Sequence, residues 1–94
     1  MGFSVLDEVY SIILDRLESK PQGSYTWETA SRGVDHVARK VGEEAVELVV
    51  EAVKGDRDRI AEEAADLLYH LLLLLAVTGV TPDMVEEVLR GRMK

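Results

Sequence analysis

Residues 57–78 read RDRIAEEAADLLYHLLLLLAVT, and every position from Leu67 to Val77 except His70 is apolar. This run of eleven residues is well short of the roughly 20 that span a bilayer, so it predicts a buried helix and no membrane span. A helix that is apolar all round has to be covered all round, and the rest of a 94-residue chain is short for that task. The sequence therefore predicts a homodimer or larger homo-oligomer. One central helix of a monomeric bundle is the alternative.

The stretches on either side of this segment also have helical patterns. Apolar residues recur at helical spacing from Val5 to Leu17, and Pro21 and Gly23 then end that helix. Caps, prolines and glycines predict a first helix ending near residue 19 and further helices at about 24–33, 34–54, 57–78 and 82–90. No segment alternates with period two, so the fold class is all-α. Because the loop at Gly55 is short, we expect a bundle of about five helices with a long central helical hairpin.

Composition and charge restrict the functions open to a single domain of residues 1–94. Eighteen acidic and eleven basic side chains give a net charge of −7, which argues against a nucleic-acid-binding protein. A phosphorylated small molecule stays compatible with this charge, since a divalent metal can supply positive charge. The absence of cysteine excludes disulfides, thiolate nucleophiles and cysteine-bound zinc. The N-terminus has no signal-peptide pattern, so we expect a cytoplasmic protein.

Carboxylates gather on one face of each long predicted helix. Glu44 and Glu47 share a face with Lys40, and Glu63 and Asp66 share a face of the next helix. Each pair lies about two turns from the short loop, so an antiparallel hairpin places the two pairs at the same height. Crowded carboxylates in a partly apolar site repel one another, and a bound cation relieves that repulsion. Oxygen ligands favour Mg²⁺, Mn²⁺ or Ca²⁺ over zinc.

A structural role is the alternative for each of these residues. Charged runs on helices are usually solvated, and we interpret Glu62 in this way. His70 stands alone on the most apolar helix and is interpreted as a core histidine with satisfied hydrogen bonds. Trp27 is expected to pack, whereas Tyr25 lies where it could reach a ligand.

The acids and their neighbours form motifs that resemble a known family. Glu43-Glu44-x-x-Glu47, followed after fifteen residues by Glu63-x-x-Asp66, is similar to the EExxE…ExxD pattern of the all-α nucleoside triphosphate pyrophosphohydrolases. That superfamily includes the MazG-like enzymes and the dimeric dUTPases. The segments GSYT (23–26), KVGEEA (40–45) and EEAADLLYHLL (62–72) are more specific and resemble the phosphoribosyl-ATP pyrophosphohydrolase family of histidine biosynthesis.

This resemblance covers nearly the whole chain, from the first predicted helix to the end. One departure is Thr29, where the family pattern leads us to expect leucine. The departure concerns the packing of the short second helix and leaves the chemistry of the acids untouched.

The resemblance implies hydrolysis of phosphoribosyl-ATP to phosphoribosyl-AMP and pyrophosphate, with Mg²⁺ as cofactor and Mn²⁺ as a possible substitute. It implies that Glu43 or Glu47 orients or deprotonates the attacking water. The metal ligands that it implies are Glu44, Glu47, Glu63 and Asp66. Substrate contacts are expected from Lys40, Arg39, Arg32, Ser24, Tyr25 and Thr26. For the last three residues, capping of the second helix is the alternative.

Two other functions remain open at the level of sequence. A house-cleaning pyrophosphohydrolase of the MazG-like type would use the same acids on another nucleotide. A non-catalytic, acidic helical dimerisation module would have no need of acids that converge. If the chain is instead a phosphoribosyl-ATP pyrophosphohydrolase, the cyclohydrolase that acts next in the pathway is expected to be a separate chain.

Overall fold

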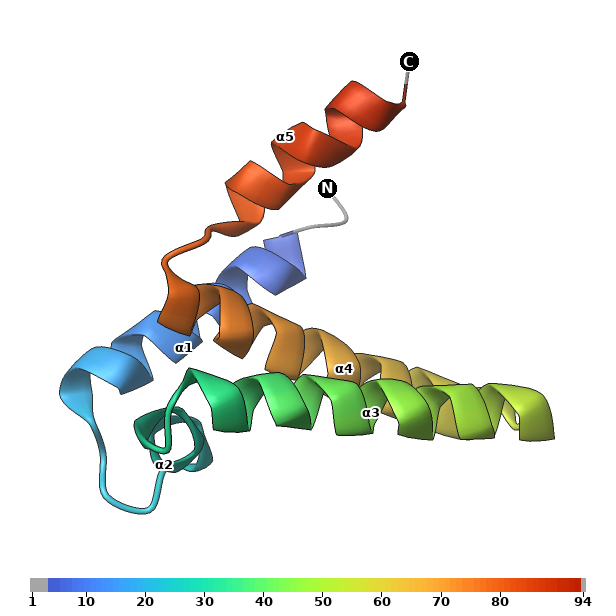
Figure 1. Cartoon of the computed structure of the whole chain (residues 1–94), viewed down its shortest axis with the longest axis horizontal. Helices are drawn as coiled ribbons and strands as arrows, with labels where there is room; N and C mark the ends of the chain where they lie inside the picture. Colours follow the sequence, from blue (N-terminus) through green and yellow to red (C-terminus); the bar gives the residue numbers. More distant parts are fainter. Residues whose placement is uncertain (1–3, 94) are drawn as a thin grey trace.

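The computed structural model describes residues 4–93, which form five α-helices and no strand (Figure 1). In chain order these are α1 (Ser4–Ser19), α2 (Tyr25–Ser31), α3 (Val34–Lys54), α4 (Arg57–Thr78) and α5 (Pro82–Arg92). The predicted all-α class is confirmed, and the predicted bounds of the third and fourth helices agree with the structure.

Local sequence signals set most of the helix ends. The side chain of Ser24 accepts a hydrogen bond from the Trp27 backbone N–H at 3.2 Å, and Asp56 caps α4 in the same manner. Gly55, with φ of 84°, takes the left-handed conformation that closes α3. Thr81 caps α5 ahead of Pro82, and the helix runs two residues further than its pattern predicted.

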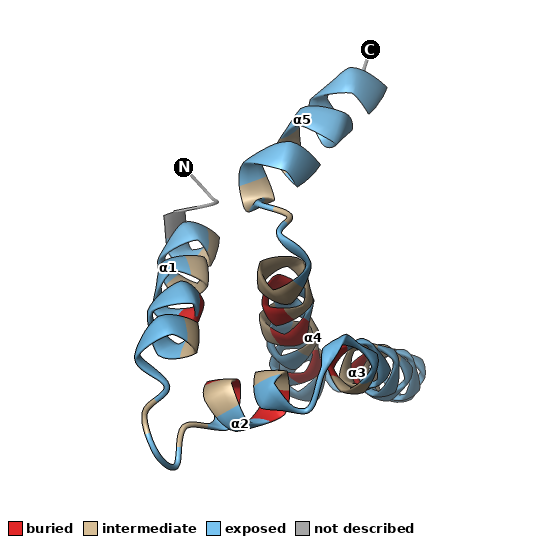
Figure 2. Ribbon diagram, turned by 60° about the vertical axis from the view of Figure 1, so that its left-hand side comes forward, coloured by how far each residue is buried: buried red, intermediate tan, exposed pale blue. Residues whose placement is uncertain are grey.

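Helices α3 and α4 form the predicted antiparallel hairpin, and α1 and α2 pack against α4 (Figures 1 and 2). The buried apolar core is small and consists of Ile13, Val37, Leu72 and Leu73. The Tyr10 hydroxyl donates to the carbonyl oxygen of Val80 at 3.0 Å and so ties α1 to the connection between α4 and α5. The hairpin is therefore held from one side by α1 and α2.

Helix α5 does not join this bundle, which differs from the expectation of about five packed helices. It extends away from the other helices and contains no buried residue (Figures 1 and 2). As a result, Leu68 and Leu71 on α4 are left 41% and 38% exposed beside α5. An apolar groove of about 220 Å³ lies between α1, α4 and α5 and is left open by the single chain. 

Among the described residues, no single helix is both long and apolar enough to cross a membrane. Only α4 and α5 taken together meet the criteria of length and composition, and the two are bent by 109° at their junction.

Candidate active site

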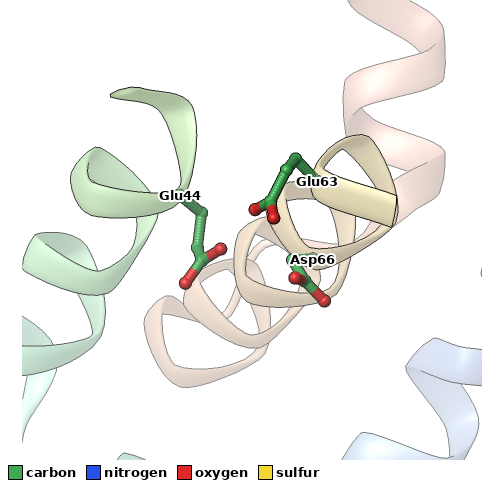
Figure 3. Close-up of side chains that lie close together, drawn as sticks. All are labelled: Glu44, Glu63 and Asp66. Carbon is green, nitrogen blue, oxygen red and sulfur yellow. The ribbon is translucent and has the colours of Figure 1, made fainter. Parts of the chain in front are cut away.

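Three carboxylates from the two arms of the hairpin converge. Glu44 extends from α3 toward Glu63 and Asp66 on α4 (Figure 3). One carboxylate oxygen from each residue lies within 4.8 Å of the other two. The prediction that acids on the two helices face each other at the same height is therefore correct for these three residues.

The charges of this cluster are poorly compensated by the protein itself. Glu44 and Glu63 are buried, and the Oε1 atom of each has no hydrogen-bond partner among residues 4–93. Burial raises the pKa of the Glu63 carboxyl, and the nearby Glu47, as hydrogen-bond partner and like charge, raises it further. A hard divalent cation would satisfy both unpartnered oxygens, so the donor set fits Mg²⁺ or Mn²⁺.

The other two acids of the motif lie at the edge of this cluster. Glu47 is exposed and lies close enough to Glu63 to raise its pKa. Glu43 is also exposed and forms an ion pair with Lys40, with Nζ and Oε1 3.4 Å apart. The pKa of Lys40 is raised, first by the negative charge that Tyr25 acquires on ionisation and then by the hydrogen bond to Glu43. Lys40 therefore stays protonated at neutral pH.

The sequence interpretation missed Arg59, which supports the acid cluster from α4. Its guanidinium lies 3.0 Å from the Oε2 atom of Glu63 and 2.6 Å from the Oε1 atom of Glu62. It also lies 3.9 Å from the Oε2 atom of Glu51. The ion pair between Arg59 and Glu63 could have been predicted from the sequence, because the two residues are four positions apart on one helix face.

His70 is a buried histidine whose two ring nitrogens are both hydrogen-bonded, as predicted. Its Nδ1 atom lies 2.7 Å from the backbone carbonyl oxygen of Asp66, and its Nε2 atom lies 2.8 Å from the Tyr25 hydroxyl. A carbonyl only accepts, so Nδ1 carries the proton and donates. In the neutral ring, Nε2 then accepts from the Tyr25 hydroxyl. These two hydrogen bonds connect α2, through His70, to the backbone of the candidate metal ligand Asp66.

Ser24, Tyr25 and Thr26, which were expected to contact substrate, make different contacts in the structure. Ser24 caps α2, and the hydroxyl of the buried Thr26 is hydrogen-bonded to the Tyr69 hydroxyl. Tyr25, which is half-exposed, lines a cavity. Thr29, which stands where leucine was expected, is buried, and it lies within the helix α2.

A polar cavity of about 250 Å³ lies between α2 and α3, next to Lys40. Its lining residues are Tyr25, Glu28, Thr29, Arg32, His36 and Lys40. Arg32 and Lys40 were predicted to contact substrate, whereas the exposed Arg39 does not line this cavity. His36 was missed, although it lies one helical turn before Lys40 on the same face.

Comparison with known proteins identifies relatives along the whole chain. The sequence model of the phosphoribosyl-ATP pyrophosphohydrolase family matches residues 6–93. A phosphoribosyl-ATP pyrophosphatase of Sulfurisphaera tokodaii is 51% identical over 94 residues, which is the full length of both chains. Proteins of the same description from Saccharolobus solfataricus and Saccharolobus islandicus are 49% and 48% identical, again over the full length of both chains.

Proposed function

Because the chain belongs to the phosphoribosyl-ATP pyrophosphohydrolase family, we propose that it hydrolyses phosphoribosyl-ATP to phosphoribosyl-AMP and pyrophosphate. The family predicted from the motifs is thus confirmed. The observation that carries the activity is the cluster of Glu44, Glu63 and Asp66, with two buried oxygens that no group in the described part of the chain satisfies. In the reaction, water breaks the bridge between the α and β phosphorus atoms, and pyrophosphate leaves.

Incubation of the protein with phosphoribosyl-ATP and a small panel of nucleoside triphosphates tests this proposal. We expect pyrophosphate release from phosphoribosyl-ATP first, abolished by EDTA and restored by Mg²⁺. A preference for another triphosphate would favour the house-cleaning activity, and no release from any nucleotide would favour the non-catalytic module. Convergent, unpartnered acids support an enzyme over that module.

The metal ligands that we propose are Glu44, Glu47, Glu63 and Asp66. When bound there, Mg²⁺ neutralises charge on the phosphate oxygens and acidifies the attacking water. We assign to Glu47, which is exposed at the edge of the cluster, the role of accepting a proton from that water. Glu43 is the second candidate for this role; it is exposed, directly precedes the buried Glu44 on α3 and forms an ion pair with Lys40.

Lys40 is the proposed phosphate contact, because it stays charged and lies between the acids and the polar cavity. We expect Lys40→Met to lower kcat/KM roughly 10²-fold, since one charged donor to the phosphates is lost. Steady-state kinetics beside a thermal melt checks this. The ion pair with Glu43 is partly exposed, so the melting temperature should hardly change. A lower melting temperature with unchanged kcat/KM would make Lys40 a purely structural residue.

We further propose that the protein functions as a homodimer or larger homo-oligomer. The groove between α1, α4 and α5 is lined largely by apolar side chains, including Leu68, Leu71 and Leu89. Soluble monomers rarely leave contiguous apolar surface of this kind uncovered. A second copy of the chain that packs its own α4 and α5 into the groove would bury both surfaces at once.

Leu71→Glu tests this assembly, because the carboxylate would enter the groove. Light scattering should give at least twice the chain mass of 10.5 kDa for the wild-type protein and 10.5 kDa for the variant. Val53→Glu is the matched control, since Val53 is 83% exposed at the hairpin tip. A wild-type mass of 10.5 kDa at micromolar concentration would contradict the proposal.

The remaining expectations concern the setting of the enzyme. We place it in the cytoplasm, because a substrate with several phosphates does not cross membranes unaided. We expect residues 1–94 to act as one domain.

A further inference from the structure

The polar cavity between α2 and α3 is adjacent to the acid cluster, but most of its charged side chains are basic. Lys40 lies one turn before Glu44, and His36 lies one turn further, about 12 Å from Glu44 along the helix at 1.5 Å per residue. The cavity combines two permanent cations, Arg32 and Lys40, with the imidazole of His36. Cationic side chains gathered in this way suit an anion that no metal accompanies.

The proposed substrate has such an anion. Phosphoribosyl-ATP carries its triphosphate at one end and a separate phosphate monoester on the second ribose. Four carboxylates around Glu44 and Glu63 would repel a phosphate that has no bound cation. That monoester therefore needs a binding site away from the acids, on the same face of the protein.

We infer that the cavity lined by Arg32, His36 and Lys40 binds the phosphate monoester of the phosphoribosyl group, an inference that rests on the proposed function. Arg32 and His36 then determine specificity, because nucleoside triphosphates lack this second phosphate. The Glu28 carboxylate in the same cavity can accept hydrogen bonds from the hydroxyls of the attached ribose.

Tyr25 fixes the position of this cavity relative to the acids. Its hydroxyl donates to His70, and His70 in turn donates to the carbonyl oxygen of Asp66. The half-exposed ring of Tyr25 lines the cavity from α2. The two ends of the substrate are thereby held at a spacing set by α3 and by the contact between α2 and α4.

The kinetic test uses Arg32→Ala and His36→Ala in the full-length protein with Mg²⁺ present. Each variant should raise KM for phosphoribosyl-ATP about 10- to 100-fold with kcat nearly unchanged, as expected when a charged hydrogen bond in substrate binding is lost. Arg57→Ala is the control, because it removes the same charge from an exposed residue at the far end of the hairpin. Unchanged KM in both cavity variants, or an equal rise in the control, would overturn the inference.

A binding measurement separates this inference from the proposed function. Ribose 5-phosphate, added to the wild-type protein, should shift the NMR signals of the His36 ring and of the Arg32 side chain. In Arg32→Ala the shifts of His36 should be strongly reduced, while binding of pyrophosphate with Mg²⁺ should be unaffected. No shift in the wild-type protein, or parallel loss of pyrophosphate binding, would overturn the subsite. A wild-type protein that shows these shifts but releases no pyrophosphate from phosphoribosyl-ATP would instead refute the proposed function.

Discussion

Glu44→Gln is expected to abolish pyrophosphate release while leaving the protein folded. Glu44 is 8% exposed, and its Oε1 atom has no partner in the described part of the chain, so the charge serves no structural contact there. Removing it relieves repulsion with Glu63 and Asp66, and the melting temperature of the metal-free protein should stay constant or rise. We expect kcat/KM to fall by at least about 10²-fold, the scale found when one group that stabilises the transition state is removed.

Glu62→Gln is the matched control for this experiment. Glu62 is one residue from Glu63, but its side chain is 63% exposed and contacts Arg59 in the solvated surface. The Glu62→Gln variant should retain the kcat/KM of the wild-type protein. Near wild-type activity of Glu44→Gln at subsaturating Mg²⁺ would exclude Glu44 as a metal ligand.

Addition of Mg²⁺ should raise the melting temperature of the wild-type protein substantially. A cation that binds only the folded state at 100 times its Kd contributes about 2.7 kcal/mol, which corresponds to a shift of about 11 to 22 °C for a domain of this size. Differential scanning calorimetry with and without Mg²⁺ measures the shift, and NaCl of equal ionic strength controls for general screening. The same shift in Glu44→Gln would mean that the cation binds elsewhere.

This stabilisation should depend on pH in a defined direction. The pKa of Glu63 is raised in the folded state by burial and by Glu47, so the folded protein holds a proton that the unfolded chain has already lost. Stability of the metal-free protein therefore falls as the pH rises from the ordinary glutamate pKa through the raised value. Mg²⁺ requires the ionised carboxylates, so the shift that it causes should grow over the same interval. A shift that shrinks with rising pH would contradict this explanation.

The helix ends were predictable because the interactions that set them are local. Asp56 caps α4 through backbone groups two and three residues away, and Gly55 and Gly79 adopt left-handed conformations that few other residues tolerate. The facing of Glu44 and Glu63 was predictable for a related reason. A helical wheel and a short loop fix which faces of two adjacent helices meet.

The contacts that were not predicted depend on tertiary packing. Tyr25 and His70 are 45 residues apart, and no periodicity indicates that α2 should lie against that turn of α4. The position of α5 is a second case. Its sequence has a proper cap and an apolar stripe, yet α5 extends away from the other helices and leaves Val88 and Leu89 54% and 49% exposed.

The hairpin also has a consequence for the order of events during folding. Glu44, Glu47, Glu63 and Asp66 all lie on α3 and α4, which are joined by the two residues Gly55 and Asp56. Contacts between residues close in sequence form with little loss of chain entropy, and chains rich in them fold quickly. The candidate ligands can thus meet without waiting for α1 or α2 to dock. A cation present during synthesis would find its ligands on one short, continuous segment of the chain.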